Sequence, residues 1–409
     1  MLTILQPEIL LFLKDFPGGL FPLRQQDGSM SLVLKLMKEN ILTVRVRREF
    51  RIYIAPTKFL GRSAFGLITA FFDDMDEPLC LFSPMADGDP FTDEITELFS
   101  QETFNVYFFD DQDRELLGYE ASNPDHEKMA DAVKLAKFPP PDLGTLRQQL
   151  ADLGSWFANR LPSDDASALR VNLGRPLYPE DLAVIDYRPE VNDHFGDHSP
   201  KLSMLERPEP GRLQEIDIIG QLRRVFSGRN IFHGPIRSDD GKEYVDILVA
   251  TKDHHFIIQA KDSPNTEASL NRGIARKKST SFSHMEKAVA QLRGAINYWK
   301  NADFLHLLTM DLCHKISTEG RSLWGIVVVK ELFDGDQLEY SRPVLNLSSA
   351  TQTPCIVIDY RQLHEITFHR RDEQGFIDAV TAVYEGGLEY GHYPRLRFGL
   401  VADGDVNAN

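Results

Sequence analysis

Apolar and polar residues alternate along much of the first 125 residues, with the period of two that is typical of half-buried β-strands. Apolar residues alternate with polar ones over residues 42–46 and again over residues 50–54, and the polar positions of this region include Arg45, Arg47 and Arg51. Three further apolar stretches follow, at residues 64–72, 78–84 and 104–119. The last of them contains a polar turn, which favours a hairpin. We therefore predict a separate β-rich N-terminal domain over residues 1–135, of unknown role.

A proline run interrupts this pattern at residues 137–142, KFPPPD. Consecutive prolines remove backbone donors and disfavour helix in the residue before them. Apolar residues then return at helical spacing between Leu146 and Phe157 and predict a short amphipathic helix. Residues 162–210 are rich in Pro, Asp, Gly and His and show weak periodicity. We therefore expect a Pro-rich, partly helical connector over residues 136–210.

From residue 211 the pattern becomes regular. Apolar residues recur every three positions at first and predict a helix, and strands and helices then follow at residues 230–236, 242–250, 254–261, 283–300, 322–331, 354–360 and 372–385. Ser283 and Glu286 have the spacing of a capping box at the start of the long helix. The order α, β, β, β, α, β predicts an α/β domain over residues 211–395, followed by a flexible tail over residues 396–409.

The composition is that of a soluble globular protein. A chain of 409 residues exceeds the usual single domain of about 100–200 residues, and no apolar run approaches the ~20 residues that cross a bilayer. The apolar N-terminus lacks the basic region of a secretory signal. Three widely spaced cysteines form neither a disulfide framework nor a zinc pattern, which indicates a reducing compartment. We expect a cytoplasmic protein that does not contact a membrane.

Charge is distributed unevenly along the chain. The net charge of −16 argues against binding to a polyanion. Residues 211–300 nevertheless contain 15 Lys and Arg against 10 Asp and Glu, a net charge of +5, which leaves −21 for all other residues. Any contacts with nucleic acid are therefore expected in this locally basic region.

The hairpin predicted over residues 242–261 places polar side chains at the tip of an apolar strand. With a four-residue loop after Ala250, this residue pairs with His255, and counting back along both strands puts Asp246 opposite Gln259. Alternation places Lys261 on the same face as Gln259. A carboxylate, an amide oxygen and an ammonium therefore converge at one end of the hairpin.

Such a group of side chains suits a hard divalent cation, Mg²⁺ or Mn²⁺, which prefers oxygen ligands. Asp246 is the expected principal ligand, Gln259 a neutral second ligand, and the carbonyl of Ala260 a third. Lys261 would orient or deprotonate an attacking water and offset charge in the transition state, and Glu215 on the preceding helix can add a carboxylate. The alternative is a near-surface ion pair between Asp246 and Lys261, with Gln259 satisfying a backbone group.

At these residues the sequence resembles the PD-(D/E)xK nuclease superfamily, also called restriction-endonuclease-like. The core order αβββαβ is similar to that of residues 211–330, and the motif is similar to Asp246 followed by Gln259 and Lys261. The Gln form looks most like the Mrr-type nucleases. The resemblance covers roughly 120 to 180 residues and implies a metal-dependent nuclease that hydrolyses DNA, in a restriction or antiviral setting.

Two departures from the superfamily pattern leave a rival interpretation open. No proline precedes Asp246, and Gln259 in place of Glu removes one negative ligand. The rival is a catalytically inactive nuclease fold that serves as a nucleic-acid-binding or assembly module. A third interpretation is a scaffold in which the N-terminal domain binds a partner protein or a second copy of the chain.

Basic and polar side chains around the long helix are the expected DNA contacts. RecB-like members of the superfamily carry a Gln and a Tyr on this helix, a feature that Gln291 and Tyr298 resemble. The basic residues before the helix are expected in a loop that clamps phosphates, with a solvated charged loop as the alternative. The predicted contacts are Arg272, Arg276, Lys277, Lys278, Lys287, Gln291 and Tyr298. A second basic cluster, Arg45, Arg47, Arg48 and Arg51, is interpreted as a solvated strand face.

Overall fold

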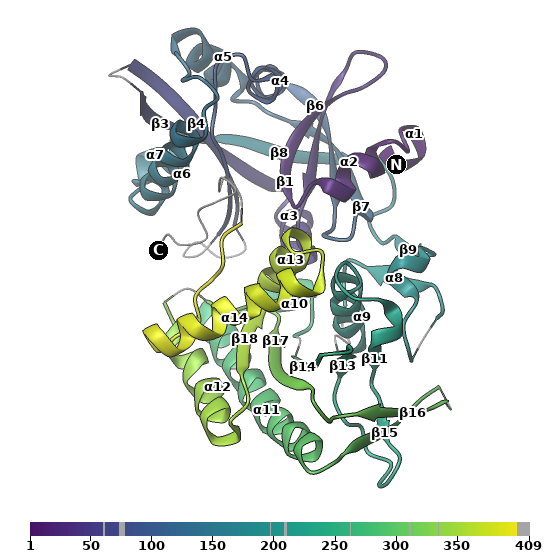
Figure 1. The fold of residues 1–409 in the computed structure, drawn as a ribbon. Coiled ribbons are helices and arrows are strands. Elements are labelled where there is room, and N and C mark those ends of the chain that lie inside the picture. The colour runs from purple at the N-terminus through teal and green to yellow at the C-terminus, as the bar shows by residue number, and fades with distance from the viewer. Residues whose placement is uncertain are drawn as a thin grey trace.

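The computed structural model is a mixed α/β structure built around two large sheets (Figure 1). It describes residues 1–59, 62–72, 78–196, 198–207, 211–261, 263–310, 312–333 and 335–398. The predicted tail begins at residue 396, so all of it beyond residue 398 lies outside the described residues. None of the helices in the described part of the chain is long and apolar enough to span a membrane.

The N-terminal sheet has eight strands in the order β1-β2-β6-β7-β8-β3-β4-β5, and only the β2–β6 pair is parallel. Its strands are β1 (Gly19–Arg24), β2 (Met30–Lys35), β3 (Glu49–Phe59), β4 (Arg62–Phe71), β5 (Leu79–Ser83), β6 (Thr103–Phe109), β7 (Glu115–Ser122) and β8 (Leu169–Pro176). The helices of this part are α1 (Leu2–Leu5), α2 (Ile9–Asp15), α3 (Lys38–Arg47), α4 (Pro90–Phe99), α5 (His126–Leu135), α6 (Leu143–Ala158) and α7 (Pro162–Ser167). The hairpin expected within 104–119 is β6–β7.

Residues 42–46, predicted as a strand, lie instead in helix α3. Ile41, Leu42 and Val44 are fully buried there, which a strand with one solvated face would not allow. The alternation extends over only five residues. Packing against the sheet therefore outweighs the β-propensity of the valines and determines the conformation.

Most of the predicted connector is part of the N-terminal fold. Strand β8 lies inside the sheet between β7 and β3, with Leu169 and Val171 buried. Helix α6, which was predicted, packs Leu153 and Phe157 against Tyr53 of β3. The Pro- and Asp-rich composition of residues 162–210 hides the short alternating stretch that forms β8. Among the described residues between β8 and α9, the regular elements are β9 (Ala183–Asp186), α8 (Pro189–Asn192) and β10 (Lys201–Met204).

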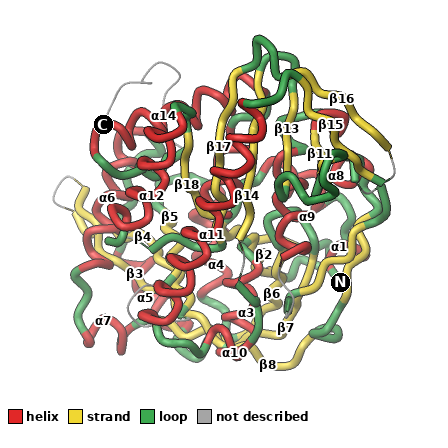
Figure 2. Tube along the Cα trace, turned by 90° about the horizontal axis from the view of Figure 1, so that it is seen from below, coloured by secondary structure: helices red, strands yellow, loops and turns green. Residues whose placement is uncertain are grey.

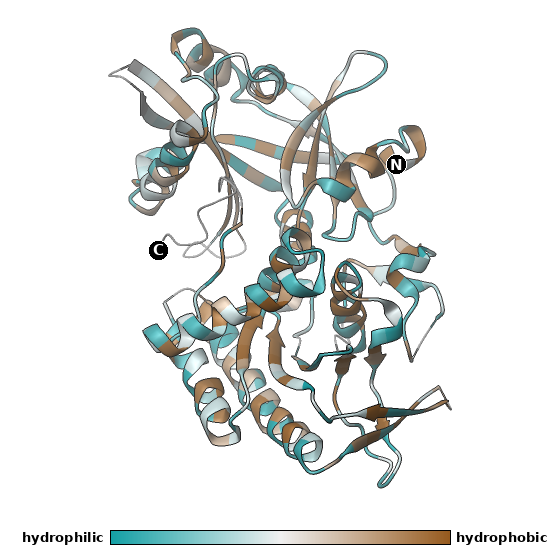
Figure 3. Ribbon diagram, in the orientation of Figure 1, coloured by the Kyte–Doolittle hydropathy of each residue, from teal (hydrophilic) through white to brown (hydrophobic). Residues whose placement is uncertain are grey.

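The C-terminal sheet has the strand order β11-β13-β14-β17-β18, in which β14, β17 and β18 are parallel. Its strands are β11 (Ile231–His233), β13 (Ile247–Ala250), β14 (His254–Lys261), β17 (Ser322–Val329) and β18 (Cys355–Asp359). The central strands are apolar along their length (Figure 3). A small side sheet, missed in the sequence, contains β12 (Ile236–Arg237), β15 (Phe304–Thr309) and β16 (Leu312–Ser317).

Helices cover both faces of this sheet, and Figure 2 shows α11 running beside β14 and β17. The helices and the single 3₁₀ turn described here are α9 (Gly211–Leu222), η1 (Gly228–Asn230), α10 (Glu267–Leu270), α11 (Ile274–Lys300), α12 (Gln337–Thr351), α13 (Tyr360–His369) and α14 (Glu373–Tyr390). Trp299 of α11 donates to His255 of β14, whereas Phe256 contacts Phe376 of α14. Odd-numbered residues of β14 therefore face α11, and even-numbered residues face the opposite layer.

Helix α11 begins at Ile274, nine residues before the predicted start. Ser283 and Glu286 lie inside the helix, so they form no capping box. Residues 276–278 occupy the first turns of α11 rather than a loop, because Arg, Lys and Ala are good helix formers. Three of the four basic side chains predicted to clamp phosphates are therefore presented by a helix, and Arg272 lies just before it.

Candidate functional site

The β13–β14 hairpin has the register that was predicted from the sequence. Ala250 lies opposite His255, and Ile247 lies opposite Ile258. Asp246 directly precedes β13, so the next position in this register faces Gln259. The side chains of Gln259 and Lys261 lie on the face of β14 that is covered by α11.

The carboxylate of Asp246 is tied to the end of β14 by two contacts. Its Oδ2 atom accepts from the backbone N–H of Ala260 at 2.8 Å and from Nζ of Lys261 at 3.2 Å. The same Lys261 ammonium donates to the carbonyl of Ala260 at 2.9 Å. Two of the oxygens predicted as metal ligands therefore converge on one cation, and here that cation is the lysine ammonium.

Charge repulsion and burial act together on Asp246. Its side chain is only 9% exposed, and burial raises its pKa; the Lys261 ammonium opposes this shift, and the nearby Glu215 carboxylate adds to it. The site therefore holds more negative charge than its desolvated surroundings favour, which is the condition that a bound cation would relieve.

Glu243 is a further carboxylate of this cluster, and it was missed in the sequence. Partial burial of its carboxyl raises its pKa, and Asp246 and Glu215 add to the shift, while Lys261 and His233 oppose it. Because the residue as a whole is exposed, water screens much of this effect. A regular strand would turn Glu243 away from Asp246, and this is why alternation gave no signal for it.

Glu215 comes to the cluster from α9, as predicted, but its direct partner is a histidine. Oε2 of Glu215 lies 2.8 Å from Nε2 of His233, at the end of β11. Glu215 thus acts on Asp246 through its charge and not through a shared hydrogen bond. His233 was not predicted, and nothing in the pattern NIFHGPI distinguishes it from an ordinary strand-end residue.

The donor set fits a hard cation. Among the described residues, no three His, Cys, Asp or Glu side chains lie close enough to form a metal-binding cluster by themselves. The Asp246 carboxylate and the Ala260 carbonyl nevertheless share one cation, and oxygen donors are what Mg²⁺ and Mn²⁺ prefer. Gln259 lies near the same end of β14, where it is buried beside Val327 of β17. Binding of a metal requires the Lys261 ammonium to move aside.

The predicted DNA-contacting residues lie along α11 and just before it. Arg272 precedes the helix, Arg276 is exposed in its first turn, and Lys278 pairs with Asp336 at 2.9 Å. The N-terminal end of a helix carries partial positive charge, so additional cations there are unfavourable unless an anion is nearby. Lys287 and Gln291 are exposed further along α11.

The same helix reaches the candidate site. Burial lowers the pKa of His284, and the charges of the Lys287 and Lys261 ammonium groups lower it further. Tyr298 packs its ring 5.5 Å from that of Tyr244, two residues before Asp246. The polar stripe of α11 therefore borders the group formed by Asp246 and Lys261.

The arginine cluster of the N-terminal part is largely neutralised within the chain. Arg48 pairs with Glu180 at 2.7 Å, and Arg45 pairs with Glu206. The interpretation of the cluster as a solvated strand face was wrong, because Arg45 and Arg47 lie in helix α3 and the side chain of Arg45 is only 17% exposed.

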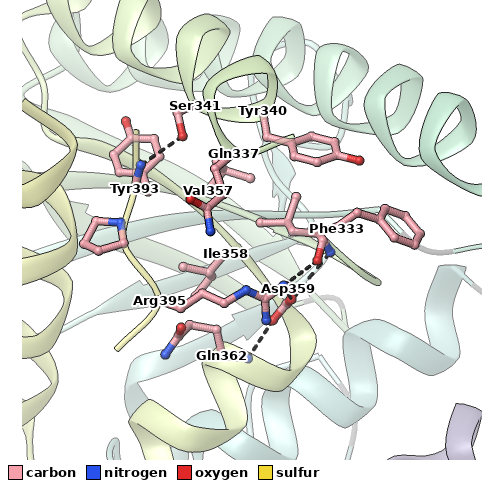
Figure 4. A pocket seen from close by; sticks show the side chains of 12 residues that line it. Phe333, Gln337, Tyr340, Ser341, Val357, Ile358, Asp359, Gln362, Tyr393 and Arg395 are labelled. Atoms are coloured by element: carbon pink, nitrogen blue, oxygen red, sulfur yellow. Dashed lines mark hydrogen bonds and ion pairs between the residues drawn. The ribbon is translucent and has the colours of Figure 1, made fainter. Parts of the chain in front are cut away.

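A small, partly open hollow is lined by other residues than these. It is formed beyond the ends of β17 and β18, where Arg395 pairs with Asp359 at 2.8 Å (Figure 4). Its volume of about 30 Å³ leaves room for little more than water. A wider groove of about 450 Å³ beside Trp299 and Trp324 opens at the other end of the parallel strands. Neither hollow is lined by Asp246, Gln259 or Lys261.

Comparisons with known proteins give little further information. The chain matches no family model and no curated protein. Among solved structures, the small subunit (R.BspD6I2) of the heterodimeric restriction endonuclease R.BspD6I aligns with a TM-score of 0.28 and 12% sequence identity, over 45% of this chain and 90% of that chain. A TM-score of 0.28 is too low to establish a shared fold, so the site has to be judged by its own side chains.

Proposed function

We propose that this protein is a metal-dependent nuclease that hydrolyses phosphodiester bonds, most simply in DNA, with Mg²⁺ or Mn²⁺ as cofactor. The observation that carries the proposal is the convergence of the Asp246 carboxylate and the Ala260 carbonyl on the ammonium of Lys261, at the polar tip of an otherwise apolar strand. By resemblance to the PD-(D/E)xK nucleases, a role in restriction or antiviral defence is the setting that we propose.

In this proposal Asp246 and the Ala260 carbonyl hold the metal, with Gln259 as a neutral ligand and Glu215 as a further carboxylate. When bound, the metal supplies a Lewis acid for the scissile phosphate and lowers the pKa of a water. Displaced from Asp246, the Lys261 ammonium orients the attacking water and compensates the charge that develops on the phosphate. Glu215 holds His233 at the edge of the site. The basic first turns of α11 bind phosphates on either side of the cleaved bond.

The test is plasmid degradation with and without Mn²⁺ by the parent protein and by Lys261→Ala. We expect the parent to cleave only with metal and the variant to lose cleavage. Lys242→Ala is the control, because this lysine lies in the segment just before β13 with a side chain that is 75% exposed, and it should behave like the parent. Equal cleavage by the parent and by Lys261→Ala would show that this site does not catalyse the reaction.

The second candidate is a nuclease-like module that binds nucleic acid without cutting it. The ion pair between Lys261 and Asp246 favours it, since a lysine that stays in place would occupy the position of the metal. Under this reading, the parent binds DNA in a gel-shift assay but never degrades it at any Mn²⁺ concentration.

A further inference from the structure

The turn between β6 and β7, residues 110–114, is docked onto helix α9 through a buried polar interface. At its centre is Asp217, whose carboxylate contacts Nζ of Lys38 at 2.6 Å, Nη2 of Arg114 at 2.9 Å and Nη1 of Arg207 at 3.1 Å. All four side chains are at most 6% exposed. Burial would raise the pKa of Asp217, but these three cations outweigh it and lower the pKa.

The turn also contacts the backbone of α9 directly. Nε2 of Gln112 donates to the carbonyl of Asp217 at 2.9 Å, and Gln221 donates to Asp111 at 3.1 Å. Gly220 allows this approach, because a Cβ atom at this position would lie 2.5 Å from Oε1 of Gln112. The position of α9 along its axis is therefore fixed by the N-terminal part of the chain.

Arg207 joins this interface to the strand that carries Lys261. Its guanidinium binds Asp217 and, through Nη2, Glu39 at 3.1 Å. Its backbone pairs with Asn265, four residues after Lys261, with N–H to carbonyl distances of 2.8 and 3.0 Å. One buried residue thus contacts α9, α3 and the segment that follows β14.

The two sides of α9 have different partners. Residues 215 and 217 are about 200° apart around a helix, so they point in nearly opposite directions. Glu215 faces His233 and the carboxylates of the candidate site, whereas Asp217 faces the N-terminal part. Buried ion pairs contribute little net stability once their desolvation is counted, and their best-attested use is to fix one arrangement of packed elements.

We infer that Arg207 and Asp217 are positioning residues, through which the N-terminal domain sets the distance between Glu215 on α9 and the Asp246–Lys261 group on the hairpin. The inference rests on the proposed function for its catalytic consequence. It makes the N-terminal domain a regulator of the site: a ligand or partner that moves the 110–114 turn would change the rate of cleavage.

The test compares the parent, Arg207→Lys and Arg371→Gln, all as full-length chains. Lysine keeps the buried positive charge but cannot hold Asp217 and Glu39 together as the planar guanidinium does. Arg371 provides the matched control, because it pairs with Asp15 at 3.0 Å across the same two parts of the chain but contacts neither α9 nor β14. Arg207→Met is the stronger variant, used if lysine restores both contacts through water.

Two readouts are needed, amide hydrogen exchange and Mn²⁺-dependent plasmid cleavage. In Arg207→Lys we expect faster exchange in both residues 211–222 and 254–261, and a kcat that is about 10- to 100-fold lower with little change in KM. Arg371→Gln should match the parent in both.

The outcomes separate this inference from the proposed function. If the parent never cleaves but exchange in the two segments rises together in Arg207→Lys, the proposed function fails and the coupling stands. If exchange in the two segments and kcat both stay at parental values while the melting temperature falls, Arg207 is only structural and the inference is overturned. The same result follows if Arg371→Gln slows cleavage equally.

Discussion

Asp246→Asn separates a catalytic carboxylate from a structural one. Asparagine has the same shape, and its Oδ1 atom can still accept from the backbone N–H of Ala260, which now contacts Asp246 at 2.8 Å. What is lost is the charge, and with it the ion pair to Lys261 at 3.2 Å. The lysine side chain is 22% exposed, so its ammonium can regain water.

The two interpretations predict different free energies of unfolding. In the nuclease interpretation, the buried charge of Asp246 is retained for the metal, so its removal changes stability by less than about 1 kcal/mol, or by about 2 °C in Tm. If the pair with Lys261 is structural, removal of one partner of a buried pair costs about 3–5 kcal/mol. Mn²⁺ at 100 times its Kd should stabilise the parent by about 2.7 kcal/mol and leave the variant unchanged.

The pH dependence supplies a second criterion. Burial raises the pKa of Asp246 in the folded state, so between the unfolded value of about 3.9 and this raised value the folded protein binds the proton more tightly. Stability of the parent therefore falls as the pH rises through that window. The variant lacks this pH-dependent loss of stability. The Tm of the variant minus the Tm of the parent should therefore increase from pH 4 to pH 7.

The assay is thermal unfolding of both proteins at pH 4 and pH 7, with and without Mn²⁺, alongside plasmid cleavage. A variant that is still stabilised by Mn²⁺ and still cleaves would refute the assignment of Asp246 as the principal ligand. A loss of several kcal/mol at pH 7, without metal, would instead show that the ion pair is structural.

Three variants and one fragment test the neighbouring assignments. Gln259→Glu should bind Mn²⁺ more tightly and keep measurable cleavage, while Gln259→Ala should lose cleavage by orders of magnitude; a fully active Ala variant with a destabilised Glu variant would end the metal-site reading. Replacement of residues 276–278 by Gln should weaken DNA binding and reduce the slope of log K against log salt concentration by up to about 0.9 per lost phosphate contact. An unchanged slope in a filter-binding assay would show that this end of the helix does not contact phosphates. A fragment that starts at residue 205 should be insoluble or unfolded by circular dichroism, because Asp217 would lose Lys38 and Arg114; a folded, monomeric fragment would contradict this.

The hairpin and its register could be predicted because they depend on local information. A loop length and a period of two were enough to place Asp246 opposite the end of β14, and the Ala250–His255 pair is present as expected. Glu243 and His233 could not be found in this way. They join the cluster where the chain leaves regular strand geometry, and no periodicity describes that region.

Helix α9 shows a second reason why parts of the structure could not be predicted from the sequence. Its apolar residues repeat every three positions, and this pattern correctly predicted a helix with one buried side. Gln214, Asp217 and Gln221 have helical spacing too, and in sequence they are indistinguishable from a solvated face. All three are buried, and Asp217 and Gln221 have partners more than a hundred residues away in the β6–β7 turn or on α3. A polar interface between distant segments leaves no mark on local hydrophobic patterns.

The charge repulsion at the candidate site and the buried polar interface of α9 are physically connected. The Glu215 carboxylate raises the pKa of Asp246 because the two negative charges repel each other, and this repulsion pushes Glu215 on α9 away from Asp246 on the hairpin. The salt contact to His233 resists this on one side of α9. On the other side, Asp217 anchors the helix with three buried cations, none of which would be needed if α9 had only to cover the sheet. The interface with the N-terminal domain thus holds α9 from the side opposite to Glu215, as the proposed positioning role of Arg207 and Asp217 requires.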